Sequence, residues 1–384
     1  MKAADDLFDW LVDGAPGATQ STDIVERIGR DLAAAGLPID RVHVFVTTLH
    51  PTVLGRQFRW SIDEPVRTLE LTLAIQQTAA FAQSPLIPVT KSRTEVRRNL
   101  EGVLAKDDFG VLHDLKKEGF TDYLCAPLPF VSGETHAATF ATRAKRGFSD
   151  EHLATIRRIL RPLARVAEIY ALQRVASNLL STYVGRNSGD RILSGRIMRG
   201  DMETLRAVIW FSDLRGFTSM SARLPPRAII DLLNELFDCQ VPAIEKHGGE
   251  VLKFIGDGLL GIFPFDDDLD VRAGDALAAA NDAFMALDAR NAAAPEPIRF
   301  GLALHVGEVA YGNIGGASRL DFTAIGPAVN VAARLEGLTG KLDRRIVVSS
   351  ELAARVRVAL EDLGTFELKG VPDEQRVFAV CAIS

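Results

Sequence analysis

Residues 207–220, AVIWFSDLRGFTSM, run from a buried-strand pattern straight into a carboxylate. The apolar residues 207–211 predict a strand, Asp213 follows it almost at once, and Gly216 lies in the turn behind. A second stretch, EVLKFIGDGLLGIFPF (250–265), predicts two strands joined at a Gly-Asp-Gly turn that carries Asp257. A first strand and a middle hairpin of this kind commonly lie side by side in one sheet. We therefore expect both carboxylates to meet at one edge of the sheet.

Two carboxylates at one point repel each other unless a cation lies between them. Mg²⁺ is the natural candidate, because it prefers oxygen ligands and usually takes one or two carboxylates together with phosphate oxygens. The turn at Gly216 fits the same chemistry, since successive backbone N–H groups in such a turn can hold a phosphate. The pattern predicts a two-metal site for phosphoryl-type transfer. The alternative is that Asp213 caps a turn and Asp257 is an ordinary residue at a hairpin tip.

The other patterns of the C-terminal region predict an α+β domain. Helices are predicted over 225–249, about 269–290 and 327–338, and strands over 207–211, 345–350 and 376–383. Residues 298–315 predict a further strand pair. This order, with a hairpin between helices, indicates an antiparallel sheet covered by helices.

The first part of the chain predicts a separate region. Helices are predicted over 24–37 and 147–172, and strands over 41–49, 123–130 and 136–142. Ser149 is a good N-cap for the second of these helices. Glycines 185, 189, 195 and 200 break the following pattern and predict an irregular connector. We therefore expect a regulatory domain at 1–170, a helical linker and connector at 171–200, and a catalytic domain at 201–384.

Composition limits the class of protein. Of the 384 residues 47% are hydrophobic and 24% are charged, which is ordinary for a globular protein with buried cores. The net charge of −6 offers no broad basic field, so we expect no nucleic-acid partner. The three cysteines are far apart and predict neither disulfides nor a zinc site. No apolar run is as long as a membrane helix and the N-terminus lacks a signal sequence, so we expect a cytoplasmic protein.

Three blocks of the C-terminal region resemble the signature blocks of class III nucleotide cyclases. They are FSDLRGFT (211–218), GGEVLKFIGDGLLGIF (248–263) and DFTAIGPAVNVAARLE (321–336), and they occur in the expected order. The resemblance implies the ferredoxin-like fold of that family, an antiparallel sheet covered by helices. It also implies conversion of a nucleoside triphosphate into a 3′,5′-cyclic monophosphate and pyrophosphate, with two Mg²⁺ or Mn²⁺ ions in each active site. The connector RILSGRIMRGD (191–201) resembles the short transducer that precedes such domains.

The resemblance implies a role for each matching residue. The metal ligands would be Asp213, Asp257 and the carbonyl of Leu214. Phosphate contacts would come from Gly216, Phe217, Thr218 and Lys369. Lys253 and Thr323 would select adenine, Asn330 would orient the ribose, and Arg334 would stabilise charge on the α-phosphate.

By this resemblance, the residues at the base-selecting positions indicate ATP as the substrate. A guanine-selecting cyclase usually carries an acidic residue at the position of Lys253. Many relatives have Asp at the position of Thr323, and this chain departs from them; a subgroup uses Thr, whose hydroxyl can accept a hydrogen bond from the adenine amino group. Asn330 and Arg334 are four residues apart, so they share one face of their helix, which is either part of the site or simply solvated.

In this family the metal-binding residues and the base-binding residues come from opposite sides of a dimer interface. The chain carries both sets, which implies a head-to-tail homodimer with two composite sites. One alternative is a degenerate domain that binds nucleotide and signals without catalysis. A guanylate cyclase is another, and so is a diguanylate cyclase, although GGEVL at 248–252 precedes the acidic turn here instead of forming it.

The first region resembles a GAF-type sensory domain. The resemblance rests on two strands around the Ser132–Gly133 turn, followed by the FSDEHL helix (148–153). It implies that this domain regulates the cyclase in response to a small ligand or signal that the sequence does not identify. Cys125 lies on a predicted strand, and we expect it in a core rather than at a chromophore.

Overall fold

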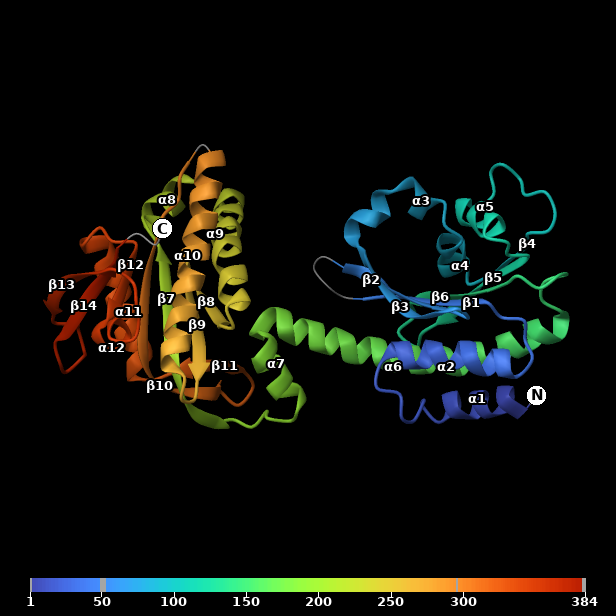
Figure 1. Cartoon of the computed structure of the whole chain (residues 1–384), viewed down its shortest axis with the longest axis horizontal. Helices are drawn as coiled ribbons and strands as arrows, with labels where there is room; N and C mark the ends of the chain where they lie inside the picture. Colours follow the sequence, from blue (N-terminus) through green and yellow to red (C-terminus); the bar gives the residue numbers. More distant parts are fainter. Residues whose placement is uncertain (1, 49–52, 295, 382–384) are drawn as a thin grey trace. The chain divides into compact units, whose positions relative to one another are not determined.

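The computed structural model describes residues 2–48, 53–294 and 296–381. The chain divides into two compact units, Met1–Leu179 and Leu180–Ser384, and each has its own sheet and its own cores (Figure 1). Helix α6, Asp150–Val184, begins in the first unit and ends in the second. Leu49 of the predicted strand 41–49 and the last residues of the predicted strand 376–383 lie outside the described residues.

The first unit is built on a six-stranded antiparallel sheet in the order β3-β2-β1-β6-β5-β4. Its strands are β1 Arg41–Thr47, β2 Val53–Ser61, β3 Glu64–Thr72, β4 Val96–Asn99, β5 Asp122–Pro129 and β6 Thr135–Thr142. Its other elements, before α6, are α1 Lys2–Val12, α2 Ser21–Ala34, the 3₁₀ helix η1 Leu73–Gln77, α3 Ala79–Ala82, α4 Leu86–Ser92 and α5 Gly110–Lys117.

Alternating side chains give this sheet two apolar faces. One face packs against α1, α2 and α6 in a large core, into which Val42, Val44 and Val46 of β1 point. The other face packs against α4 and α5 in a smaller core. Cys125 is fully buried in the smaller core, as predicted, and burial raises the pKa of its thiol to about 12.

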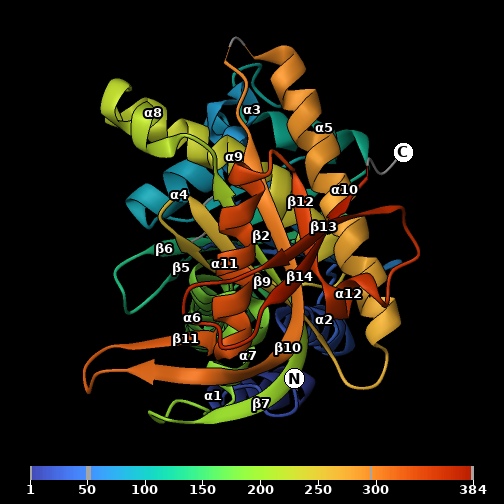
Figure 2. The same cartoon turned by 90° about the vertical axis from the view of Figure 1, so that its left-hand side faces the viewer.

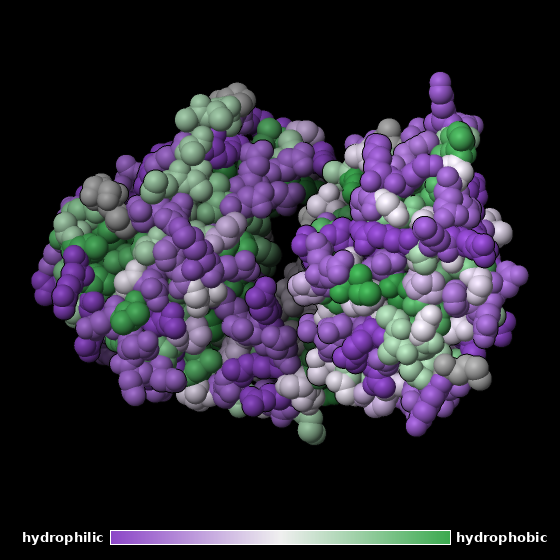
Figure 3. All heavy atoms as spheres, turned by 45° about the vertical axis from the view of Figure 1, so that its right-hand side comes forward, coloured by the Kyte–Doolittle hydropathy of each residue, from purple (hydrophilic) through white to green (hydrophobic). Residues whose placement is uncertain are grey.

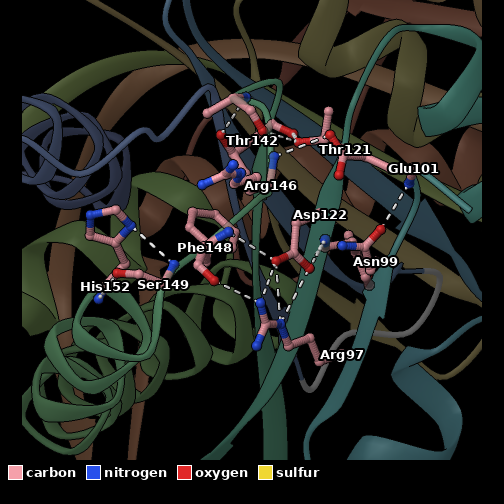
Figure 4. Close-up of polar contacts among 12 residues, drawn as sticks. Arg97, Asn99, Glu101, Thr121, Asp122, Thr142, Arg146, Phe148, Ser149 and His152 are labelled. Carbon is pink, nitrogen blue, oxygen red and sulfur yellow. Dashed lines mark hydrogen bonds and ion pairs between the residues drawn. The ribbon is translucent and has the colours of Figure 1, made fainter.

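A buried carboxylate joins three segments of the first unit (Figure 4). Asp122 is fully buried, and its Oδ2 accepts hydrogen bonds from Arg97 Nη2 at 2.7 Å and from the backbone N–H of Phe148 at 2.9 Å. The next residue, Ser149, caps α6, because its hydroxyl accepts the N–H of His152 at 3.2 Å. A buried charge requires such partners, so Asp122 fixes β4 and the start of α6 against β5.

The second unit contains an eight-stranded sheet in which β13-β14-β12-β10-β7-β9-β8 lie in order and β11 pairs with β10. Its strands are β7 Met202–Leu214, β8 Glu250–Ile255, β9 Gly258–Phe265, β10 Phe300–Gly315, β11 Leu320–Ile325, β12 Ile346–Ser349, β13 Leu360–Phe366 and β14 Gln375–Val380. Its helices are α7 Arg186–Leu193, α8 Phe217–Arg223, α9 Pro226–Lys246, α10 Leu269–Ala293, α11 Pro327–Lys341 and α12 Ser350–Ala353.

Helices cover both faces of this mostly antiparallel sheet, which makes the unit α+β, as predicted. Helices α9 and α10 share one core with β7, β9 and β10. Helix α11 crosses the opposite face, where its buried residues meet β7, β10 and β12 (Figure 2). Strand β7 lies between β9 and β10, so its C-terminal end is flanked by backbone on both sides.

The predicted strand pair at 298–315 is wrong. These residues form one long strand, β10, and its hairpin partner is β11, Leu320–Ile325. Gly307 lies inside this strand, where a Cβ would collide with the side chain of Ala328 on α11. Gly307 therefore allows α11 to pack closely against β10 and does not mark a turn.

The predicted connector is also more helical than expected. Helix α6 continues to Val184 and ends at Gly185, whose φ of 86° favours glycine. Gly189 does not break the chain but lies inside α7, where a Cβ would come within 3.1 Å of the Cβ of Leu180. Because Gly189 has no side chain, α7 can pack against the end of α6.

Helix α7 is attached to the sheet by a buried carboxylate on β8. Glu250 is 7% exposed, and it accepts hydrogen bonds from the hydroxyls of Ser188 and Tyr311, each at 3.0 Å. Asn187 adds a third donor at 3.2 Å. Three side chains from α7 and β10 thus satisfy one carboxylate, which fixes α7 against β8.

The surface is mostly polar. In Figure 3 hydrophilic residues cover most of the visible face of each unit, and hydrophobic residues form small patches between them. Within the described ranges, no helix is both long enough and apolar enough to cross a membrane.

Candidate active site

The structure brings the two predicted metal-binding aspartates together. Asp213 is the penultimate residue of β7, and Asp257 immediately precedes β9, the neighbouring strand. The pKa of Asp213 is raised to about 6, first by burial and then by the negative charge of Asp257 and the contact between the two carboxyl groups. The site therefore combines two acidic groups, of which at least one resists ionisation.

A glycine lies on each of the two strands that flank Asp213. Gly301 on β10 lies directly opposite Asp213, and Gly258 follows Asp257 at the start of β9. A Cβ at Gly258 would lie 3.2 Å from Asp213 Oδ1 and 2.9 Å from the carbonyl oxygen of Ser212. Gly258 thus allows β7 and the Asp213 side chain to approach closely, whereas a Cβ at Gly301 would collide with the side chains of Thr339 and Glu336 on α11.

The donor set fits a hard divalent cation. Two carboxylates are the ligands that Mg²⁺ takes from a protein when phosphate oxygens and water supply the others. Within the described residues no group of three or more His, Cys, Asp or Glu side chains is arranged to hold a metal ion. A cation bound by Asp213 and Asp257 would therefore complete its coordination with substrate and solvent.

The turn after Asp213 is the predicted phosphate-binding segment. Leu214 is buried and ends β7, and Gly216 has a left-handed φ of 76°, which favours glycine. Phe217 and Thr218 then begin α8. Arg215 fixes the turn, because its guanidinium donates hydrogen bonds to carbonyl oxygens at and beyond the C-terminal end of α11. The backbone of the turn is thereby held rigid beside the carboxylate pair.

A second group of predicted residues lies at β8 and β11. Lys253 on β8 forms an ion pair with Asp321 on β11. Thr323 is two residues further along β11, and its Oγ1 is buried without a hydrogen-bond partner among the described residues. An ammonium group and an orphaned hydroxyl form a donor and an acceptor of the kind that a purine edge requires.

Asp321 is a residue that the sequence interpretation missed. It belongs to the DFT block, and its spacing of two from Thr323 places both side chains on one face of β11. That alternation was readable from the sequence once β11 was recognised as a strand. The incorrect strand pair at 298–315 concealed it.

The remaining predicted residues are exposed. Asn330 and Arg334 share the outer face of α11, while Val331 and Leu335 are buried beneath it. Within the described parts of the chain, neither Asn330 nor Arg334 forms a hydrogen bond or ion pair with the aspartates. Lys369 is exposed in the segment between β13 and β14. Within one chain, Asn330 and Arg334 on α11 are therefore separate from the Asp213–Asp257 pair.

Comparisons with known proteins agree with the fold of the second unit. A family model of the adenylate and guanylate cyclase catalytic domain matches residues 202–382. An adenylate cyclase of Anabaena cylindrica is 36% identical over 159 residues, which are 40% of this chain and 31% of that protein. The chain thus spans about a third of the length of that relative.

Two solved cyclases are also similar to this chain. The guanylyl cyclase Cya2 is 30% identical over 49% of this chain and 96% of its own, with a TM-score of 0.41. A bacterial light-regulated adenylyl cyclase is 20% identical over 65% of this chain and 83% of its own, with a TM-score of 0.50. The second likeness concerns the fold alone.

Proposed function

The chain belongs to the class III family of adenylate and guanylate cyclases, and we propose that it is an adenylate cyclase that converts ATP into 3′,5′-cyclic AMP and pyrophosphate. The observation that carries this proposal is the Asp213–Asp257 carboxyl pair, which is partly exposed at the C-terminal end of β7. Paired carboxylates at a strand end, next to a rigid glycine turn, suit a triphosphate with its divalent cations.

In the proposed reaction the ribose 3′-oxygen attacks the α-phosphorus. The new P–O bond forms as the bond to the bridging oxygen of pyrophosphate breaks, and the 3′-hydroxyl proton leaves to solvent. Asp213, Asp257 and the Leu214 carbonyl would hold two Mg²⁺ or Mn²⁺ ions, which when bound lower the pKa of the 3′-hydroxyl and neutralise phosphate charge. The N–H groups around Gly216, Phe217 and Thr218 would bind phosphate oxygens, with Lys369 as an additional cation.

The base would bind between β8 and β11. Lys253 would donate a hydrogen bond to a ring nitrogen of adenine, and the Thr323 hydroxyl would accept one from the amino group. Asp321 competes for the same ammonium group, so adenine binding would exchange or share the ion pair observed here. The family includes guanylate cyclases as well as adenylate cyclases. The proposed preference for ATP over GTP therefore depends mainly on Lys253.

The complete site would require two chains. Asn330 would orient the ribose and Arg334 would stabilise charge on the α-phosphate, both across the interface of a head-to-tail homodimer. Their exposure on α11, apart from the aspartates of the same chain, supports this arrangement. The first unit would regulate the cyclase through α6 and α7, in response to a signal of unknown chemistry.

The test measures cyclic AMP and cyclic GMP formed by the full chain from ATP or GTP, with Mg²⁺ or Mn²⁺. We expect cyclic AMP from the wild type and none from Asp213→Ala or Arg334→Ala alone. An equimolar mixture that exchanges subunits should recover about a quarter of the wild-type rate, because half of the dimers would carry one intact site.

Each outcome has a defined meaning. No product under any condition, combined with retained ATP binding, would replace the enzyme by a degenerate domain that signals through nucleotide binding. Product from each variant alone would refute the composite site. Cyclic GMP as the main product would refute the role given to Lys253.

A further inference from the structure

A third carboxylate lies beside the aspartate pair. Glu336 is on α11, and its Oε1 is 2.6 Å from the position that a Cβ of Gly301 would take. Gly301 is directly opposite Asp213 in the β7–β10 register, so a Gly301 side chain would share the face of Asp213. The Thr339 hydroxyl lies closer still to that position, so Thr339 and Glu336 together occupy the space beside Asp213 that a Gly301 side chain would take.

The position of Glu336 is set by the helix that carries it. Thr339, one turn further along α11, is 1% exposed and donates a hydrogen bond to Glu336 Oε1 at 3.1 Å. The charge of Arg215 acts on Glu336, but its guanidinium donates hydrogen bonds to carbonyl oxygens at and beyond the C-terminal end of α11. Within the described residues, no ion pair includes Glu336.

The three carboxyl groups act on one another. Burial, followed by the charge of Asp213, raises the pKa of Glu336 to about 7, and Asp257 contributes in the same direction. Ionised Glu336 destabilises the folded protein, because Asp213 and Asp257 repel its charge and no ion-paired partner among the described residues compensates for it. A role at the cation site accounts for its position.

We propose that Glu336 is the outer carboxylate of the divalent-cation site, and that it binds a water molecule of the cation's hydration shell rather than the cation itself. This inference rests on the proposed two-metal function. Within the described residues, no three acidic side chains are arranged to hold one metal ion together, and we therefore assign Glu336 to the outer position. Mg²⁺ usually keeps several waters, and outer groups that orient them strengthen binding.

The test measures Mn²⁺ binding by the full chain, without nucleotide and with a non-cyclisable ATP analogue, from the electron paramagnetic resonance signal of free Mn²⁺ at pH 8.5. Glu336→Gln keeps the shape and removes the charge. For a divalent cation about 7 Å from one carboxylate in a nearly aqueous medium, Coulomb's law gives about five- to tenfold weaker binding. Glu336→Asp keeps the charge and should lose less than about threefold.

Two further variants separate this inference from the proposed function. Glu245→Gln removes an exposed carboxylate on α9 and should leave Mn²⁺ affinity unchanged. Asp213→Asn should abolish tight binding. If Asp213→Asn weakens binding and Glu336→Gln does not, the outer role is refuted and the two-metal site stands. If Asp213→Asn binds Mn²⁺ like the wild type, the two-metal site itself fails.

A structural role makes a different prediction. If Glu336 only stabilised α11, Glu336→Gln would shift the midpoint of thermal unfolding and leave the Mn²⁺ affinity of the folded protein intact. The affinity is therefore measured on variants whose circular dichroism matches the wild type. A variant that fails this criterion is replaced by Thr339→Val, which removes the donor that holds Glu336 and should also weaken Mn²⁺ binding.

Discussion

Replacing Asp213 by asparagine should stabilise the second unit at neutral pH while it removes activity. Burial and the charge of Asp257 raise the pKa of Asp213 from its ordinary value of 3.8 to about 6. Because the fold disfavours the ionised form, ionised Asp213 destabilises the metal-free protein above about pH 6. Below about pH 3 the carboxyl is mostly protonated in both the folded and the unfolded chain, and the penalty vanishes.

The expected size follows from these two pKa values. Their difference corresponds to about 3 kcal/mol of unfolding free energy if it is taken in full. Asp213 is only half-buried, and solvent screening reduces the effect to about 1–2 kcal/mol. Asparagine has nearly the shape of aspartate and can still accept the N–H of Leu214, so little packing is lost. We therefore expect Asp213→Asn to gain about 1–2 kcal/mol at pH 8 and almost nothing below about pH 3.

The assay is urea unfolding of the full chain in excess chelator, at pH 8 and at about pH 3. Amide hydrogen exchange of peptides from β7 reports the second unit separately from the first. Asp238→Asn, an exposed aspartate on α9, is the control and should change neither value. A loss of stability at pH 8, or an equal gain at both pH values, would refute the coupling between the carboxylates and the fold.

Two further predictions concern buried carboxylates that have partners. Asp122→Ala should destabilise the first unit by about 3–5 kcal/mol, since it removes the acceptor of Arg97 and of the Phe148 backbone N–H. Urea unfolding, followed by hydrogen exchange of β5 peptides, measures this loss, and an unchanged midpoint would contradict it. Tyr311→Phe removes a hydroxyl 3.0 Å from both oxygens of Glu250 and should cost about 1.5–3 kcal/mol in the second unit. A matching increase in exchange over α7 is expected, and protection of α7 equal to the wild type would refute the attachment through Glu250.

The sequence predicted those parts of the site that depend on local pattern. The apolar run before Asp213 and the Gly-Asp-Gly turn at Asp257 each define a strand end, and the sheet order then brings the two together. Gly189 resembles a break in the sequence, yet it lets α7 pack against the end of α6. Gly307 lies inside β10 and lets α11 approach closely, and neither packing contact can be read from the local pattern.

Glu336 could not be found in this way. It lies next to the apolar stripe of α11, and a glutamate near the end of a helix is usually solvated. Its proximity to Asp213 depends on Gly301, which lies on another element and lets the helix sit close to the sheet. Asp321 was hidden differently, by the incorrect assignment of the strand that carries it.

The carboxylates of this chain fall into two kinds, and the contrast supports the proposed site. Asp122 and Glu250 are buried with arginine, backbone or hydroxyl donors, so each is satisfied within its own unit. Asp213 and Glu336 face other acidic groups instead, and in both burial and neighbouring charge raise the pKa. A fold that supplies donors to two buried carboxylates could have neutralised the others in the same manner. Concentrated negative charge at the end of β7 costs stability, and we infer that it is retained because a divalent cation and its phosphate ligands require it.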